Sequence, residues 1–378
     1  MLGCERKSRF MGLPVNTLLA SLVAAGAQHA SPTPAPDGSL TPPFEVNLPV
    51  PGFESRSENL ELESALDAAF DRFSFRAPAW SVTVHSADIS WSRTSGASNN
   101  ALFPAASITK SMTAAVIFQL IEEGELALTD TLDTWYPGAP NAEVVSIDHL
   151  LTHRSGLNPV EQASMTNLAP EVGEALPPSI EGRFRPGTGW EYSNLGYALL
   201  GRIIEEVEGA PLDRVFQTRL IEPLGLEGTR LATPGEPAEN RVQGHIAGAP
   251  AEGADFAHAY AAGGLLSNSA DLVTWWRALL AGDVISPASL DNMAEAGWPL
   301  FGDPTMLYAR GLQLGVSDPG PGPMIAHFGS IEGFSSTVAW LPRHEIFVSV
   351  IAADQAVPSQ AAMWALVQAA DEARPSAR

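Results

Sequence analysis

The amino-acid sequence predicts an α+β domain that carries a helical insertion. Strand-like segments occur towards both ends of the 378-residue chain, and residues 130–260 read as helices broken by proline and glycine. Strands and helices that are segregated along a chain in this way favour an α+β fold over a parallel α/β sheet. The hydrophobic content of 45% and the length suffice for a large core in one or two domains.

The first thirty residues have the pattern of a secretory signal peptide. Three basic residues precede an apolar run at 11–27 that ends in small residues. Proline, asparagine and glycine interrupt the run and make it a poor membrane span, so an uncleaved anchor is the alternative. We expect residues 1–27 to be removed on export to a secreted or periplasmic site. Residues 28–58 are rich in proline and are expected to form a linker or an extended arm.

The composition limits the expected partners. The only cysteine, Cys4, lies inside the predicted signal peptide, so we expect no disulfide in the mature protein. The formal net charge is −22, and removal of the basic N-terminal residues makes it more negative, which argues against nucleic acid and anionic membrane surfaces. We expect a small-molecule or peptide substrate, while the oligomeric state stays open.

The folded domain is expected to cover residues 59–378, with a helical subdomain at about 130–260. In chain order, the expected elements are a helix at 60–73, a hairpin of strands at 79–86 and 89–96, helices at 107–123, 146–153, 193–209 and 270–282, strands at 311–317, 336–342 and 345–353, and a last helix at 359–373. The first helix is amphipathic, and the hairpin strands carry Trp, Val and Thr between turn residues. The helix at 107–123 is apolar on nearly every face, which predicts burial, and Gly124 ends it.

One lysine stands out. Apart from Lys7, Lys110 is the only lysine, whereas arginine occurs nineteen times. Lys110 follows Ser107 by three residues in the first turn of the predicted helix, so their side chains share a face. A serine becomes a nucleophile when a neighbouring base takes its proton; a neutral lysine can be that base and arginine cannot. Burial and the helix N-terminus would both lower the lysine pKa, although S-x-x-K also arises by chance with an exposed lysine.

Two further segments offer candidate residues. "YSN", with Tyr192 and Asn194, supplies a phenol and an amide that could relay and orient protons; the alternative is a helix start capped by Ser193 or Asn194. "HFGSIEG" (327–333) reads as a strand edge with two glycines, where the backbone can approach a ligand closely. The alternative there is a bulged strand with a surface histidine.

The order and separations of S-x-x-K, Y-x-N and H-x-G resemble the serine β-lactamase and penicillin-binding protein superfamily. Within it, they resemble the branch of class C β-lactamases, DD-carboxypeptidases, D-aminopeptidases and carboxylesterases. Further similar segments are "LLTHRSGL" (150–157), "PGTGWEYSNLGYALLGRIIE" (186–205), "PLGLEGT" (223–229) and "AGGLLSNSADLVTWW" (262–276). The resemblance implies an antiparallel sheet flanked by helices on both faces, with an inserted helical subdomain.

The resemblance also implies catalytic roles. Ser107 would be the nucleophile and Lys110 its base, while Tyr192 would pass a proton to the leaving group. Asn194 would contact Lys110 and the substrate. The resemblance implies neither a cofactor nor a metal, and whether Lys110 or Tyr192 is the dominant base stays open.

The third motif departs from the β-lactamase pattern, because His327 stands where lysine is usual. A permanent cation suits the carboxylate of a β-lactam, whereas histidine is largely neutral above a pKa of about 6.5. The resemblance still implies that His327 and Gly329 line the substrate site and that the N–H groups of Ser107 and Ser330 form an oxyanion hole. Arg310 could supply a carboxylate partner, but the alternative of a surface arginine is the one we expect.

Other chemistries find less support in the sequence. His149 and His153 have the i, i+4 spacing of helical zinc ligands but lack the glutamate of H-E-x-x-H, so we expect no metal site. G-x-S-x-G is absent, which argues against an α/β-hydrolase. We therefore expect an exported serine hydrolase that acts on an ester or amide through a Ser107 acyl-enzyme. The alternatives are a class C-like β-lactamase or DD-peptidase and, from another class, a catalytically silent ligand-binding relative.

Overall fold

The computed structural model describes residues 33–34, 47–50, 59–159, 170–235, 241–252, 255–295, 297–315 and 322–374. The predicted signal peptide at 1–27 lies outside these residues, as does most of the predicted arm at 28–58. One described piece of the arm, β1 (Thr33–Pro34), pairs with β7 (Gly189–Trp190). Within the described residues, each helix is too short or too polar to cross a membrane.

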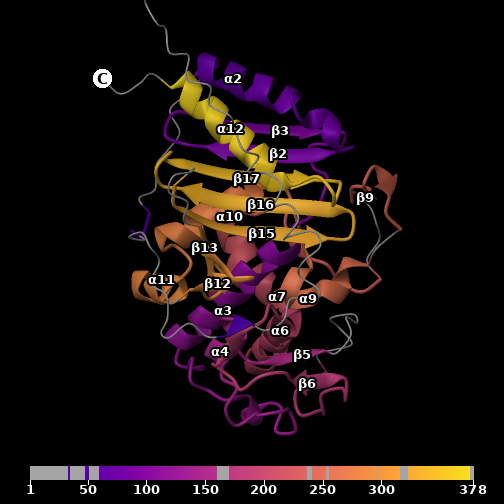
Figure 1. The fold of residues 1–378 in the computed structure, drawn as a ribbon, viewed down its shortest axis with the longest axis vertical. Helices are drawn as coiled ribbons and strands as arrows, with labels where there is room; N and C mark the ends of the chain where they lie inside the picture. Colours follow the sequence, from indigo (N-terminus) through magenta and orange to yellow (C-terminus); the bar gives the residue numbers. More distant parts are fainter. Residues whose placement is uncertain are drawn as a thin grey trace, which may run out of the picture.

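An eight-stranded antiparallel sheet runs through the centre of the molecule, in the order β12-β13-β14-β15-β16-β17-β2-β3 (Figure 1). Its strands are β2 (Trp80–His85), β3 (Ser90–Ser95), β12 (Trp298–Leu300), β13 (Asp303–Tyr308), β14 (Gln313–Gly315), β15 (Met324–Ile331), β16 (Phe334–Leu341) and β17 (Ile346–Ala352). Val350 of β17 lies opposite Val82 of β2, so strands from both ends of the chain meet in one sheet. The predicted hairpin and the three later predicted strands all lie in this sheet.

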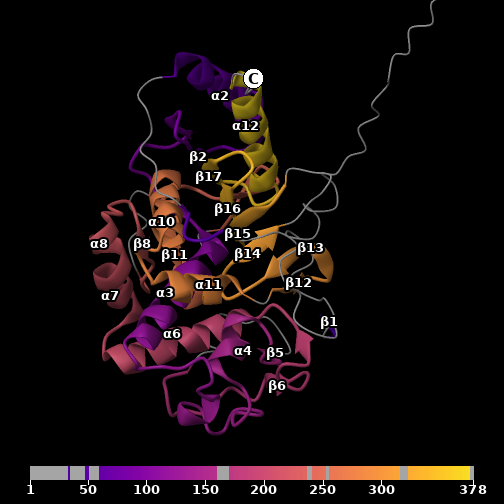
Figure 2. The ribbon, with the colours of Figure 1, turned by 90° about the vertical axis from the view of Figure 1, so that its left-hand side faces the viewer.

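Helices cover both faces of the sheet (Figures 1 and 2). Because side chains alternate along a strand, β17 sends Phe347 and Ile351 into one hydrophobic core and Val348 and Val350 into the other. The core around Val348 and Val350 is shared with α2 (Leu60–Asp71) and α12 (Ser359–Ala373). The other is shared with α3 (Thr109–Glu122) and α10 (Ser269–Ala281). The predicted fold class, an antiparallel sheet flanked by helices, is confirmed.

Further helices are α4 (Ile147–Leu151), α6 (Asn194–Glu208), α7 (Leu212–Phe216), a π-helical turn (Gln217–Ile221), α8 (Glu222–Leu224), α9 (Tyr260–Gly263) and α11 (Pro287–Ala294). Short strands are β4 (Phe103–Pro104), β5 (Leu157–Pro159), β6 (Ile180–Gly182), β8 (Arg230–Leu231), β9 (His245–Ile246), β10 (Ala249–Pro250) and β11 (Leu265–Ser267). Single 3-10 turns occur at Ser74–Arg76, Ala106–Ile108, Leu132–Thr134 and Phe256–Ala259. Many of these elements, among them α4, α6, β5 and β6, lie towards the end of the molecule away from α2 and α12, while β9 lies beside the sheet (Figure 1).

Local capping explains where α6 begins and ends. The Gly196 N–H donates to the Ser193 side chain at 3.1 Å, which satisfies one free amide of the first turn. Gly209 ends the helix with a left-handed φ of 62°, which glycine adopts without strain. The interpretation of "YSN" as a helix start is therefore correct, with Ser193 as the N-cap. Tyr192 directly precedes this cap.

Candidate active site

Ser107 lies in a 3-10 turn, Ala106–Ile108, that leads into α3. Ala106 has a left-handed φ of 51°, which is uncommon for a residue with a Cβ. The Ser336 hydroxyl of β16 donates to the Ala105 carbonyl at 2.7 Å and ties this turn to the sheet. The turn thus presents a half-buried Ser107 at the junction of sheet and helix.

Lys110 is fully buried one helical turn beyond Ser107. Its Nζ donates to Asn194 Oδ1 at 2.8 Å and to the Ala262 carbonyl at 2.5 Å, and it lies 3.2 Å from Ser107 Oγ. Burial lowers the pKa of Lys110 well below its ordinary value. The exposed-lysine alternative is therefore wrong.

These three contacts suit a neutral amine. The Asn194 oxygen and the Ala262 carbonyl can only accept hydrogen bonds, so each takes one N–H of the amine. A neutral amine has two N–H groups and one lone pair. In that form the lone pair is left for the third contact, with Ser107 Oγ, and can accept the hydroxyl proton, whereas an ammonium would donate its third N–H there.

Tyr192 lies between β7 and α6 with its ring half-buried, and its hydroxyl hydrogen-bonds with the Ser107 side chain. Packing around the hydroxyl raises the pKa of Tyr192 above its ordinary value, and the hydrogen bond to Ser107 opposes this only in part. The phenol is therefore held in its protonated form. It can serve as a proton donor beside Ser107.

Gly329 allows β15 to approach the turn that carries Ser107. A Cβ on this residue would lie 2.3 Å from Ser336 Oγ and 2.6 Å from the Ala105 carbonyl oxygen. Both distances are shorter than any tolerated contact, so the site requires glycine for close backbone packing.

Ser330 follows on the part of β15 that extends past β14. β14 pairs only with Met324, Ile325 and Ala326, and the Phe328 N–H donates to the Gln313 side chain of β14. Backbone N–H groups point alternately to the two edges of a strand, so the Ser330 N–H points to the same side as that of Phe328. This side is the one that β14 leaves unpaired at Ser330.

His327 is fully buried in β15, and the surface-histidine alternative is wrong. Its Nδ1 lies 2.9 Å from the Phe328 carbonyl, which can only accept, so Nδ1 carries the proton. Its Nε2 lies 3.2 Å from the Tyr308 hydroxyl, whose single O–H is shared between this nitrogen and the Tyr197 hydroxyl at 3.3 Å. Burial lowers the pKa of His327 to about 3. The side chain is thus a neutral internal group with both nitrogens hydrogen-bonded within the protein.

Arg310 is also held inside the protein, and the surface-arginine alternative is wrong. Its side chain forms an ion pair with Asp148 at 2.6 Å and donates to the Asn292 carbonyl at 2.6 Å. Only 8% of the residue is exposed. Its charge is therefore already balanced by Asp148.

The two histidines of "HLLTH" form hydrogen bonds with different residues. Nδ1 of His149 accepts the Ser146 N–H, and Nδ1 of His153 accepts the Ser193 N–H, each at 3.1 Å. Among the residues that the structure describes, three or more metal-ligating side chains nowhere gather in one place.

Two residues of the site were not foreseen. The Ala262 carbonyl accepts from Lys110, and the His153 ring lies 4.3 Å from the Tyr192 ring, measured between centroids. Both stand in segments that carry the family resemblance, "AGGLLSNSADLVTWW" and "LLTHRSGL". That resemblance was the available signal, because local spacing links neither residue to Lys110 or Tyr192.

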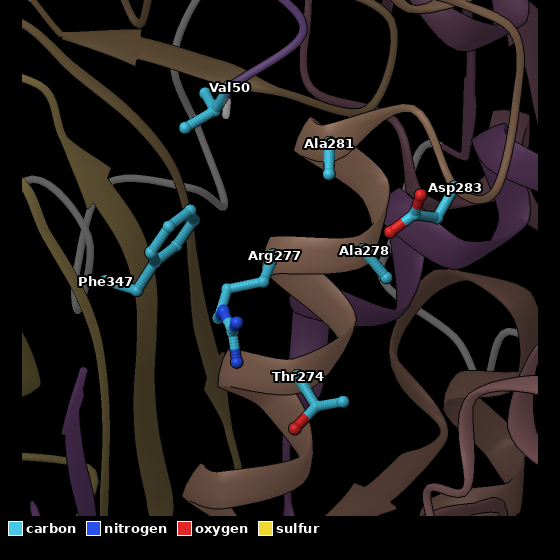
Figure 3. A pocket seen from close by; sticks show the side chains of 7 residues that line it. All are labelled: Val50, Thr274, Arg277, Ala278, Ala281, Asp283 and Phe347. Atoms are coloured by element: carbon cyan, nitrogen blue, oxygen red, sulfur yellow. The ribbon is translucent and has the colours of Figure 1, made fainter. Parts of the chain in front are cut away.

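A pocket of about 190 Å³ lies elsewhere, between α10 and the sheet (Figure 3). Its lining consists of Val50, Thr274, Arg277, Ala278, Ala281, Asp283 and Phe347. It shares no residue with the group around Ser107. Its lining also lacks a serine, cysteine or histidine, so it offers no nucleophile comparable to Ser107.

Comparison with known proteins gives similar relatives. Residues 80–372 match the family model described as Beta-lactamase. The chain is 36% identical over 140 residues to penicillin-binding protein 4* of Bacillus subtilis (strain 168), over 35% of this chain and 31% of that protein. It is 29% identical over 231 residues to esterase EstB of Burkholderia gladioli, over 49% of this chain and 58% of that protein. The chain thus spans less than two thirds of the length of these curated relatives.

Among solved structures, the D-amino acid amidase from Ochrobactrum anthropi SV3 complexed with D-phenylalanine is similar, with a TM-score of 0.71 and 22% identity. That likeness covers 83% of this chain and 100% of the amidase, and at this identity it shows the fold alone. The family match shows more than the fold, because it spans more than half of the chain and includes every candidate residue from Ser107 to Ser330. This chain therefore belongs to the beta-lactamase family.

Proposed function

We propose that this protein is an exported serine hydrolase that cleaves a neutral ester or amide through an acyl-enzyme on Ser107. The observation that carries the proposal is the set of contacts around Lys110. Two obligate acceptors take the two N–H groups of the neutral amine, which leaves its lone pair for Ser107 Oγ at 3.2 Å. A buried lysine with a lowered pKa beside a serine hydroxyl is the arrangement of an activated nucleophile.

In the proposed reaction, Lys110 takes the Ser107 proton as Oγ bonds to the substrate carbonyl carbon. The bond to the leaving group then breaks, and Tyr192 gives its proton to the departing oxygen or nitrogen. The proton held by Lys110 restores Tyr192 during the cycle. Water next attacks the acyl carbon and gives up a proton to this pair. The bond between that carbon and Oγ then breaks, the pair returns the proton to Oγ, and the acid leaves. The raised pKa of Tyr192 favours Lys110 as the base of the first step.

The proposed oxyanion hole consists of the N–H groups of Ser107 and Ser330. The first lies at the start of α3, where the helix dipole also favours negative charge. The second lies on the part of β15 that extends past β14. Removing one such donor typically costs about 10²–10³ in rate.

A neutral substrate fits the third motif. His327 has no N–H left for a substrate carboxylate, and its lowered pKa keeps it uncharged. The name of one similar protein, an esterase, supports cleavage of an ester. A penicillin-binding protein is also among the relatives, so a class C-like β-lactamase or DD-peptidase is the second candidate.

Labelling tests the proposal directly. The purified protein would be incubated with a fluorescent phosphonate, and the adduct would be located by peptide mass spectrometry. We expect a single adduct on Ser107, and its absence would favour a catalytically silent relative. A panel of short esters, D-amino acid amides, D-Ala-D-Ala peptides and a chromogenic cephalosporin would then rank the candidate activities.

The proposal also covers the processing of the chain. We propose that residues 1–27 are a cleaved signal peptide, that 28–58 form an arm, and that 59–378 are the hydrolase domain with a helical subdomain at about 130–260. The support is the basic, apolar and small order at the N-terminus. The intact mass of protein recovered from the periplasm or medium tests it, since a retained N-terminus would indicate an anchor.

A further inference from the structure

His153 is a buried histidine that the proposed reaction does not use. It follows α4 with a left-handed φ of 60°, and the residue is 1% exposed. Histidine and asparagine adopt this backbone region more often than most residues do. Its position at the end of α4 brings the ring beneath the loop that carries Tyr192.

The backbone on both sides of Tyr192 is tied to this one residue. Nδ1 of His153 accepts the Ser193 N–H at 3.1 Å. Its main-chain carbonyl accepts the Glu191 N–H, also at 3.1 Å. The residues before and after Tyr192 are therefore both anchored to His153.

The ring of His153 packs against the Tyr192 ring as well. The two centroids are 4.3 Å apart and the planes are tilted by 36°. On another side, the Tyr308 ring lies at the same centroid distance of 4.3 Å. His153 is thus wedged between Tyr192 and the tyrosine that hydrogen-bonds with His327.

The hydrogen bonding of His153 defines its protonation. Because Nδ1 accepts an amide N–H, the proton of the neutral ring is on Nε2. Burial lowers the pKa of His153 well below its ordinary value, so the ring stays neutral. The ionisable groups around it are Lys110, Tyr192, Tyr197, Tyr308 and His327.

We propose that His153 is a positioning residue for Tyr192, which it orients through the backbone of residues 191–193 and through ring packing. The inference rests on the proposed role of Tyr192 as proton donor. A misplacement of a reacting group by about 1 Å can cost about 100-fold in rate. Loss of His153 is therefore expected to lower kcat with little effect on KM.

Two substitutions separate the contributions of His153. His153→Phe keeps an aromatic ring but removes the acceptor for the Ser193 N–H. His153→Asn removes the ring but keeps an acceptor oxygen and suits the left-handed backbone. His149, on α4, provides the matched control. Its Nδ1 also accepts a backbone N–H, but that of Ser146 at the start of α4 and not that of a neighbour of Tyr192.

Kinetics on a p-nitrophenyl ester give the readout, with the thermal midpoint measured in parallel. We expect His153→Phe to lower kcat about 100-fold with KM within about threefold, and His153→Asn to recover about tenfold of that loss. The alkaline limb of kcat should move to lower pH in His153→Asn, because water reaches the Tyr192 hydroxyl once the ring is gone. His149→Phe should lower the thermal midpoint and leave kcat and the pH profile unchanged.

Several outcomes would overturn the inference. Wild-type kcat in His153→Phe would do so, as would equal losses in the Phe and Asn variants or a matching kcat loss in His149→Phe. If His153→Phe does not fold, His153→Asn decides: wild-type kcat with an unshifted alkaline limb counts against positioning. Failure of the wild-type protein to label on Ser107 would instead defeat the proposed function itself.

Discussion

The start of α3 and the middle of β15 each bury a titratable side chain completely, yet they differ in what remains available. Lys110 donates to two acceptors, and its third contact is with the hydroxyl of Ser107, a group that can either accept or donate. His327 has one nitrogen on the Phe328 carbonyl and the other on the Tyr308 hydroxyl. Burial lowers the pKa of both. The difference teaches that a buried group becomes chemically useful when its hydrogen-bonding capacity is not fully used by the fold.

The largest effect is expected from removing the Ser107 hydroxyl, the group that would give its proton to Lys110. Ser107→Ala is expected to lower kcat/KM for the best ester by about 10³-fold or more, with an unchanged fold. Ser111→Ala is the matched control, because Ser111 is buried on the same helix and accepts from the Trp275 indole rather than contacting Lys110. Turnover in Ser107→Ala above about a thousandth of wild type would place the nucleophile elsewhere.

The substitution Lys110→Arg tests whether residue 110 acts through a positive charge or through a lone pair that accepts a proton. Arginine keeps a positive charge but cannot release its proton, so we expect Lys110→Arg to lose about 10²–10⁴ in kcat, as much as Lys110→Ala. The measurement is kcat for both variants at pH 7.5. Substantial activity in the arginine variant alone would reduce Lys110 to an electrostatic anchor and make Tyr192 the base.

Gly329→Ala tests the contact between the two regions. The added Cβ would clash with Ser336 Oγ at 2.3 Å and displace β15 from the nucleophile turn. We expect a loss of about 1–3 kcal/mol in the free energy of unfolding from overpacking and about 100-fold in kcat from a displaced oxyanion donor. Gly138→Ala is the control, since its Cβ would meet nothing within 4 Å. Equal kinetics in the two variants would argue against an oxyanion role for this strand.

A smaller effect is expected from pH on substrate choice. With a pKa of about 3, His327 stays neutral from pH 5.5 to 8.5. The ratio of kcat/KM for p-nitrophenyl butyrate to that for a chromogenic cephalosporin should therefore stay above one and change less than about twofold. A ratio that falls steeply below pH 6.5 would show that His327 charges and meets a carboxylate after all. A cephalosporin rate above the ester rate at pH 7.5 would make the protein a β-lactamase.

The smallest expected effect concerns stability. The folded pKa of His327 is about 3 and the unfolded value about 6.5, so the unfolded chain binds more protons in this window. The contribution of His327 to stability is complete above pH 6.5 and falls by about 1.4 kcal/mol per pH unit below it. Urea unfolding at pH 7.5 and 5.5 measures this, and His327→Gln should show the shallower dependence. An equally steep dependence in the variant would assign the acid sensitivity to other groups.

Much of the fold could be predicted because its signals are local. The Ser193 cap and Gly209 bracket α6 at the predicted position, and the hairpin of β2 and β3 follows from its turn and strand residues. Boundaries that depend on packing were less accurate, since α4 covers only Ile147–Leu151 of the predicted 146–153. The predictions of a surface histidine at 327 and a surface arginine at 310 were wrong for the same reason. Short segments of sequence do not show which distant segments cover a side chain.

By itself, the sequence determined the spacing of Ser107 and Lys110, since helix geometry brings side chains three residues apart onto one face. It also determined the order of the three motifs and hence the family resemblance. Only the tertiary structure decided the lowered pKa of Lys110 and the burial of His327. The acceptors of Lys110 lie 84 and 152 residues away in the chain, and a pKa follows from the desolvation and partners that such distant segments impose.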